Sequence, residues 1–197
     1  GNAGWSYDEV LPYFKRSEAF VDGGDPELRG HSGALKVTLP HWPHPVCEAF
    51  LQGAEALGMP RNADYNGVSQ QGVGYFQRTI HKGWRMSTSA AFLRPAMHAR
   101  NLHVVTNAQA QRVVLRGHQA AGVVYRQGGA MHVAHARREV IVCAGAINTP
   151  KLLQLSGIGD GEQLREFGID TQVHLPGVGK HLKDHFSIRL VARVKNA

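Results

Sequence analysis

The sequence predicts a mixed α/β fold that combines helices, an antiparallel meander of short strands and one strand-to-helix turn. First, apolar residues recur at helical spacing directly after a capping box, Ser6-x-x-Glu9. Second, five short apolar segments punctuated by glycines lie between residues 102 and 143, which is typical of hairpin-connected strands. Third, an apolar run leads through Gly145 into a short helical segment. A chain of 197 residues can form one domain or parts of two.

Residues 1–85 are expected to form helices joined by loops. The predicted elements, in order, are a helix at 7–18, a loop at 21–33, a strand at 34–39, a helix at 43–57 and a turn-rich segment at 62–77. Trp5 and Val10 flank the capping box and can form a hydrophobic staple. For the second helix we expect an end at Gly58 and Pro60. Its predicted packed face consists of Ala49, Phe50, Gly53, Ala54 and Leu57.

Residues 86–182 are expected to carry most of the strands. A short helix at 87–93 should break at Pro95. The predicted strands of the meander are 102–106, 110–115, 121–125, 131–136 and 139–143, with turns at Gly117, Gly128 and Gly129. Asp160 and Gln163 predict a capped helix that stops at Gly168. Two further strands are expected, at 169–174 and at 186–194.

One stretch is more informative than the rest. The run Val140–Ala144 predicts a fully buried strand, after which Gly145 allows a sharp turn and a close approach of the backbone to another group. We expect Thr149 to cap the following helix, Pro150 to take its first position and Gly157 to end it. A strand that leads into a helix N-terminus in this way favours an anion-binding site.

Residues 145–159, Gly-Ala-Ile-Asn-Thr-Pro-Lys-Leu-Leu-Gln-Leu-Ser-Gly-Ile-Gly, closely resemble the second signature of the glucose-methanol-choline (GMC) oxidoreductases, a family of FAD-dependent alcohol oxidases and dehydrogenases. Further stretches that resemble the family, in the same order, are Trp5–Phe14, Asp64–Gly67, Gln71–Gly72, Gly83–Ser87, Leu175–Gly179 and Asp184–His185. The sequence contains neither the family's dinucleotide-binding Gly-x-Gly-x-x-Gly nor its catalytic histidine region. We therefore expect an internal piece of a longer, choline dehydrogenase-like enzyme.

The resemblance implies a partial FAD-binding, Rossmann-like domain that includes the meander, together with part of a GMC substrate-binding domain. The parts expected from it are a substrate-domain part at 1–85, an FAD-domain part at 86–182 and a strand returning to the substrate domain at 183–197. It also implies five cofactor-binding positions. Ala110 would offer main-chain atoms to the adenine, the backbone at Ala144 and Gly145 would pass close to the cofactor, and Thr149 and Pro150 would lie on the flavin side.

The implied activity is oxidation of the CH–OH group of a primary alcohol by hydride transfer to flavin. The histidine that would accept the alcohol proton is outside this sequence, so no catalytic residue is assigned and the isolated chain is expected to be inactive. Ser187 takes the substrate-side position at which choline-oxidising members tend to carry glutamate. A neutral hydroxyl group cannot offset the positive charge of a buried quaternary ammonium group, so Ser187 favours a neutral alcohol as the substrate. Oxygen and a quinone-type electron acceptor both stay open.

The charge of the chain is unevenly distributed. Residues 1–64 have a net charge of −4, whereas residues 65–138 contain 10 Lys and Arg and no Asp or Glu. This acid-free block leaves an alternative open, a basic module that binds nucleic acid or another anionic surface through residues 65–138. The arginines stand singly and no aromatic ladder interleaves with them, so we favour an ordinary basic enzyme surface and no nucleic-acid partner.

Other residue types favour no further class of site. The pairs His41/His44 and His132/His135 are each three apart, but the first lies among prolines and the second would point to opposite faces of a strand, so no metal site is expected. The two cysteines form no disulfide framework. No run reaches the ~18 apolar residues of a membrane span, and a cytoplasmic or peripherally membrane-associated location is favoured. Incomplete sheets would leave exposed edges, which favours self-association.

Overall fold

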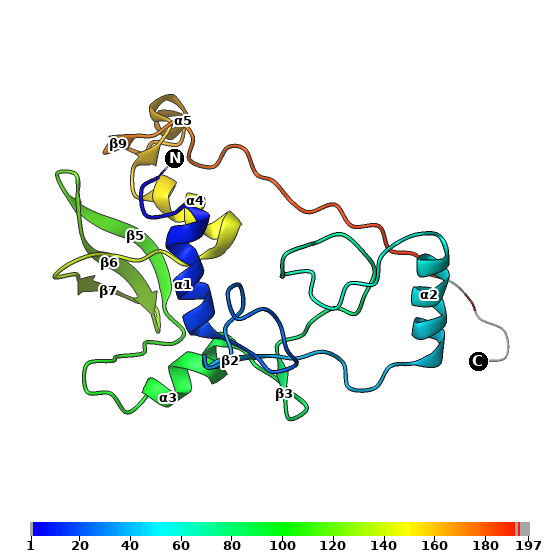
Figure 1. Ribbon diagram of the computed structural model, residues 1–197. Helices are drawn as coiled ribbons and strands as arrows, with labels where there is room; N and C mark the ends of the chain where they lie inside the picture. Colours follow the sequence, from blue (N-terminus) through cyan, green and yellow to red (C-terminus); the bar gives the residue numbers. More distant parts are fainter. Residues whose placement is uncertain (1, 192, 194–197) are drawn as a thin grey trace. The chain divides into compact units, whose positions relative to one another are not determined.

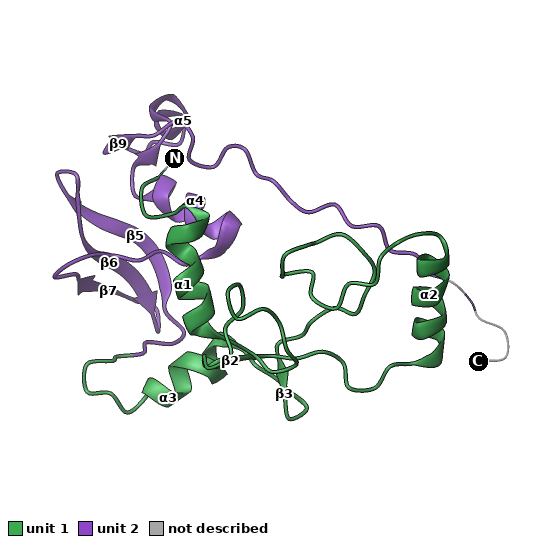
Figure 2. Ribbon diagram, viewed as in Figure 1, with its two compact units in different colours: residues 1–103, 194–197 green, residues 104–193 purple. Residues whose placement is uncertain are grey.

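The computed structural model describes residues 2–191 and 193, and the chain divides into two compact units, within residues 1–103 and 104–193 (Figures 1 and 2). Unit 1 contains α1 (Tyr7–Ser17), β1 (Glu18–Phe20), β2 (Leu35–Val37), α2 (Pro45–Ala56), β3 (Ile80–His81), β4 (Trp84–Arg85), the π-helix η1 (Ser89–Leu93) and α3 (Arg94–Ala96). Unit 2 contains β5 (Gln109–Arg116), β6 (Gln119–Gln127), β7 (Ala130–His135), α4 (Gly145–Leu155), β8 (Ile158–Gly159), α5 (Gly161–Glu166) and β9 (Val173–His174). The predicted mixture of helices and strands is confirmed.

The first helix begins as its sequence predicts. The Ser6 backbone N–H donates to Glu9 Oε2 at 3.0 Å, and the Ser6 hydroxyl donates to the same oxygen at 2.6 Å. These hydrogen bonds favour the ionised form and hold the pKa of Glu9 below its ordinary value. Helix α1 ends at Ser17, because Glu18 already belongs to β1, which pairs in parallel with β2. The sequence analysis did not predict β1, since three residues are too few for a recognisable alternation.

The predicted packed face of α2 is confirmed only at Ala54 and is wrong for its other residues. Leu51 and Ala54 are the buried residues of this helix, whereas Phe50 and Leu57 are largely exposed. Two ion pairs lie on the same side of the helix as Leu51: Arg61, in the segment after the helix, pairs with Glu48 at 3.0 Å and with Glu55 at 3.5 Å. Glu48, Leu51 and Glu55 follow one another at helical spacing, so this face of α2 lies toward that segment.

The expected break at Pro95 does not occur. The helical backbone continues from η1 into α3, where Pro95 occupies the first turn. Pro95 is the second residue of α3, so this proline removes one backbone donor from the continuous run without ending the helix.

Unit 2 is built on the predicted antiparallel meander, with strand order β5-β6-β7. The expected strands at 102–106 and 139–143, however, are not formed. The segment predicted to be fully buried is open to solvent, and Ile141 is 75% exposed. A β-strand needs a neighbour that accepts and donates its backbone hydrogen bonds, and no strand of the described residues pairs with either segment.

Helix α4 starts earlier than the sequence predicts. Its N-cap is Ala144 and its first residue is Gly145, so Thr149 and Pro150 lie inside the helix rather than at its start. The cause is the backbone of Gly145, whose φ of +84° makes the turn that leads directly into the helix. The predicted end is confirmed, because Gly157 has a φ of +77° and follows the C-cap Ser156.

The rest of unit 2 is a small parallel pair, β8 and β9, joined through α5. The predicted cap is confirmed: Asp160 accepts a hydrogen bond from the Glu162 N–H at 3.2 Å. The strand expected at 169–174 is reduced to β9. Residues 186–191 and 193 form no strand, and the other two positions of the predicted strand, 192 and 194, lie outside the described residues.

The buried apolar residues are few. In unit 1 they are Ala19, Phe20, Val37, Leu51, Ala54 and Ala91, and in unit 2 they are Val113, Val124, Leu152 and Leu164. Large side chains remain exposed in both units. In unit 1 they include Trp5, Trp42 and Trp84. No helix in the described part of the chain is long and apolar enough to cross a membrane.

Candidate cofactor site

All five predicted cofactor residues lie in unit 2, on two elements that pack together. Ala110 is on β5, opposite Tyr125 of β6. Ala144 and Gly145 form the start of α4, and Thr149 and Pro150 lie one turn further along it. Figure 1 shows α4 (yellow) against the meander strand β5. The substrate-side candidate Ser187 lies in the extended, exposed segment that follows β9.

Helix α4 is attached to β5 by a buried hydroxyl group. The Val113 N–H donates to Ser156 Oγ at 2.8 Å, and Ser156 Oγ donates to the Leu152 carbonyl at 2.6 Å. Val113 and Leu152 are both buried at this contact. The sequence analysis assigned no role to Ser156, although this residue lies within the 145–159 stretch that resembles the family signature.

The backbone of β5 has groups that can serve a ligand. The register shifts between Ala110 and Arg112, which leaves Gln111 without a cross-strand partner, as in a β-bulge. Among the described strands β5 pairs only with β6. Alternate main-chain groups along its other edge therefore face away from the sheet. This arrangement is compatible with the main-chain contact expected at Ala110.

A hollow of about 640 Å³ lies beside α4 within unit 2. Its helix wall includes Ile147, Pro150 and Lys151, and its opposite wall is the segment 179–183. Pro150 is therefore the one predicted cofactor residue that lines this hollow. The segment 179–183 leads directly to Asp184, His185 and Ser187.

Positive charge gathers at this hollow. Lys151, Lys180 and Lys183 all line it. Lys180 pairs with Asp160 at 2.7 Å, and the hydrogen bond from Lys180 is the main reason that the pKa of Asp160 lies below its ordinary value. The other two lysines form no ion pair with the described residues. Sequence analysis missed this cluster because its members come from two separate segments.

The chemistry of these residues fits an anionic dinucleotide such as FAD. The first N–H groups of an α-helix have no carbonyl partner within the helix, and its dipole is positive at that end. At the start of α4 these groups belong to Gly145, Ala146 and Ile147, close in sequence to the lysine-lined hollow. Diphosphate oxygens are favoured at such a terminus. Ile147, Pro150 and Leu182 add apolar surface of the kind that a flavin ring contacts.

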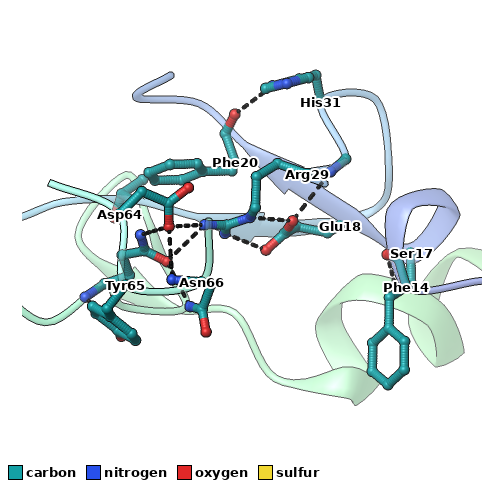
Figure 3. Close-up of polar contacts among 12 residues, drawn as sticks. Phe14, Ser17, Glu18, Phe20, Arg29, His31, Asp64, Tyr65 and Asn66 are labelled. Carbon is teal, nitrogen blue, oxygen red and sulfur yellow. Dashed lines mark hydrogen bonds and ion pairs between the residues drawn. The ribbon is translucent and has the colours of Figure 1, made fainter. Parts of the chain in front are cut away.

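Unit 1 contains a second polar cluster, centred on Arg29 (Figure 3). Arg29 is 3% exposed; its Nε and Nη2 donate to the two carboxylate oxygens of Glu18 at 2.9 and 2.6 Å. Its Nη1 donates to Asp64 and to Gln77, and its guanidinium group lies 4.2 Å from the centre of the Phe20 ring. Burial alone would lower the pKa of Arg29, but the hydrogen bond and charge of Glu18, together with Asp64, raise it.

The Arg29 cluster orders the Asp64–Gly67 stretch that resembled the family. Asp64 Oδ1 also accepts hydrogen bonds from the Asn66 N–H at 3.1 Å and from Gln77 Nε2 at 2.7 Å. The polar atoms that contact Arg29 are paired, whereas Asp64 Oδ2 is buried without a hydrogen-bond partner among the described residues. The cluster therefore explains the fold of this stretch.

Two other sequence features have simple structural settings. The acid-free block 65–138 is divided between the units, 65–103 in one and 104–138 in the other. It is therefore not one surface of one compact unit. Among the described residues, no three His, Cys, Asp or Glu side chains gather at a distance suited to a metal ion, and both cysteines are free and exposed.

Comparison with known families matches residues 1–187 to the family described as GMC oxidoreductase. The chain belongs to the GMC oxidoreductase family. The resemblance found in the sequence is thereby confirmed, and GMC family members bind FAD. The chain is 42% identical over 189 residues to the oxygen-dependent choline dehydrogenase of Staphylococcus saprophyticus, covering 95% of this chain and 34% of that enzyme. It is 42% identical to the mitochondrial choline dehydrogenase of Homo sapiens, again over 95% of this chain but 32% of the enzyme.

A solved structure shows the same arrangement of elements. The FAD-dependent oxidoreductase from Chaetomium thermophilum superposes with a TM-score of 0.83 at 32% sequence identity, over 90% of this chain and 33% of that one. This GMC chain therefore spans about a third of the length of the relatives that it matches.

Proposed function

We propose that this chain is part of an FAD-dependent oxidoreductase that oxidises the CH–OH group of a primary alcohol by hydride transfer to the flavin. The observation that carries the proposal is the packing of α4 on β5 beside a hollow lined by lysines, within a chain that belongs to the GMC family. FAD, when bound, supplies the hydride acceptor. Oxygen and a quinone-type compound both stay open as the acceptor that reoxidises it.

In this proposal the residues of unit 2 bind and orient the cofactor. The main chain at Ala110 holds the adenine by hydrogen bonds, at the β-bulge where backbone groups are available. At Ala144 and Gly145, the start of α4, the backbone passes close to the cofactor, and the N–H groups of this helix terminus favour its negative charge. Thr149 and Pro150, one turn further along, lie on the flavin side, next to the hollow that Pro150 lines. The base that accepts the alcohol proton is a histidine outside this sequence.

We also propose how the chain contributes to the domains of the whole enzyme. Residues 86–182 would form part of the Rossmann-like FAD domain, residues 1–85 part of the substrate-binding domain, and residues 183–197 the connection back to the latter. The compact units divide near residue 103 instead. That division reflects contacts within this chain, whereas domain membership depends on the sheets of the whole enzyme.

The substrate is proposed to be a neutral primary alcohol. Ser187 stands where a carboxylate would be needed to offset a quaternary ammonium in a buried pocket. In this proposal Ser187 gives the chain a substrate preference different from that of the choline dehydrogenases named above.

The test is a chimera of full length. Residues 1–187 replace the matching segment of the Staphylococcus saprophyticus choline dehydrogenase, and the purified protein is examined for bound flavin and for flavin bleaching by primary alcohols. We expect stoichiometric flavin and a preference for neutral alcohols over choline. Ser187→Glu should shift the preference toward choline by about tenfold, with Ser187→Gln as the uncharged control. A folded chimera without flavin would refute the proposed function.

The isolated chain should behave differently from the chimera. We expect it to show no alcohol turnover and only weak FAD binding, because the absent base alone removes about 10²–10⁴-fold from the chemical step. The contacts at Ala110 and Gly145 are too few to offset the cost of ordering a large flexible ligand. Gel filtration of residues 1–197 with FAD, followed by a flavin spectrum, measures this. A yellow protein that bleaches on addition of a primary alcohol would contradict it.

A further inference from the structure

We propose that Ser156 is a positioning residue of the cofactor site, whose hydroxyl group fixes α4 relative to β5. The inference rests on the proposed function, since it matters for activity only if these two elements hold FAD. Ser156 is the C-cap of α4 and is 7% exposed. It does not belong to the set of residues expected to touch the cofactor.

The hydroxyl group of Ser156 is used twice. Its hydrogen goes to the Leu152 carbonyl at 2.6 Å, a bond within the last turn of α4 that fixes the direction of the hydroxyl. Its oxygen then accepts the Val113 N–H of β5 at 2.8 Å. This second bond satisfies a buried backbone group on the edge of β5 that does not face β6. The two bonded residues are 43 positions apart, so the contact joins distant segments.

The hydrogen bond between Ser156 and Val113 lies between the two proposed ends of the cofactor site, which are Ala110 on β5 and Gly145 on α4. Along β5, Ala110 lies three residues from Val113, about 10 Å at the rise of a strand. Along α4, Gly145 lies at the opposite end of the helix from Ser156, about 16 Å away at the rise of a helix. A small rotation of α4 about Ser156 therefore displaces Gly145 strongly while leaving Ala110 in place. An extended dinucleotide that contacts both ends would be bound less tightly.

Amide hydrogen exchange on the 197-residue chain tests the contact itself. Ser156→Ala should raise exchange at Val113 by about tenfold, the change expected from losing one net hydrogen bond. Ser156→Thr keeps the hydroxyl and should stay close to the original chain. The matched control is Ser17→Ala, because Ser17 bonds the Phe14 carbonyl of its own helix at 2.8 Å and lies in unit 1 (Figure 3). That variant should leave Val113 unchanged.

Any of three results of this experiment would overturn the inference. The first is unchanged protection of the Val113 amide in Ser156→Ala, and the second is an equal loss of its protection in Ser156→Thr. The third is an equal rise in exchange throughout β6 and β7, which would mean general unfolding instead of a local release of α4 from β5.

FAD affinity in the full-length chimera tests the positioning role. Ser156→Ala should raise the dissociation constant for FAD about tenfold while kcat at saturating FAD stays within about twofold, and Ser156→Thr should restore the affinity. Equal affinity of the original chimera and its alanine variant would overturn the positioning role. An original chimera that binds no flavin would instead show that the proposed function fails, whatever the exchange experiment gives for the Ser156 contact.

Discussion

Replacing Arg29 by alanine should unfold unit 1 at a much lower urea concentration. The substitution leaves the carboxylates of Glu18 and Asp64 facing each other without their cation, and their side chains are only 23% and 18% exposed. Removing one partner of a buried ion pair costs about 3–5 kcal/mol, and we expect about 3 because both carboxylates keep some contact with water. With a urea dependence of about 2 kcal/mol per M, the midpoint should fall by about 1.5 M.

The assay is urea denaturation followed by far-UV circular dichroism, with two reference variants. Arg29→Lys keeps the charge but not the two parallel bonds to Glu18, so we expect an intermediate loss of about 1–2 kcal/mol. Arg61→Ala removes an arginine that also bridges two carboxylates but is 38% exposed, and it should cost less than about 1 kcal/mol. Equal midpoint shifts for Arg29→Ala and Arg61→Ala would refute the reasoning, because both arginines bridge two carboxylates but only Arg29 is buried and has further contacts with Gln77 and Phe20.

Further predictions concern unit 2. The pKa of Asp160 is lowered in the folded chain, so its contribution to stability is present above its unfolded pKa of about 3.9 and is lost as the pH falls through the folded value. The melting temperature of Asp160→Asn, which keeps a good N-cap residue, should therefore lie below that of the original chain at pH 7 and approach it as the pH falls through the folded pKa of Asp160; a constant gap would contradict this. Gly145→Ala should cost about 1 kcal/mol in thermal denaturation, since its φ is positive but a new Cβ would meet open space. Gly157→Ala should cost clearly more, because there the Cβ would also lie 2.5 Å from the Asp170 carbonyl oxygen; equal losses would show that the close approach can relax.

Local signals in the sequence predicted much of the fold. The capping box at Ser6, the hairpin glycines of the meander and the stop at Gly157 are each decided by residues a few positions apart, and the structure confirms them. The strand expected at 139–143 failed for a different reason. Its apolar residues favour a strand, but a strand also requires a paired neighbour, and β-propensity carries no information on whether one is present.

The candidate site was predictable in part. The signature around Gly145 located α4 and the end of the helix, but not its start, because the positive φ of Gly145 overrode the N-terminal preference of Pro150. The cluster around Arg29 and the lysines of the hollow bring together segments up to tens of residues apart. Such contacts depend on tertiary packing, so no periodicity or spacing within one segment could have indicated them.

The placement of the tryptophans decides which optical signals can follow this chain. Trp5, Trp42 and Trp84 all belong to unit 1, and each is exposed in the folded chain. Unfolding therefore transfers no indole ring from an apolar environment into water, and the emission of the native chain should already be that of solvated tryptophan. A fluorescence melting curve would be nearly flat for unit 1 and blind to unit 2, and its flatness would say nothing about thermal stability.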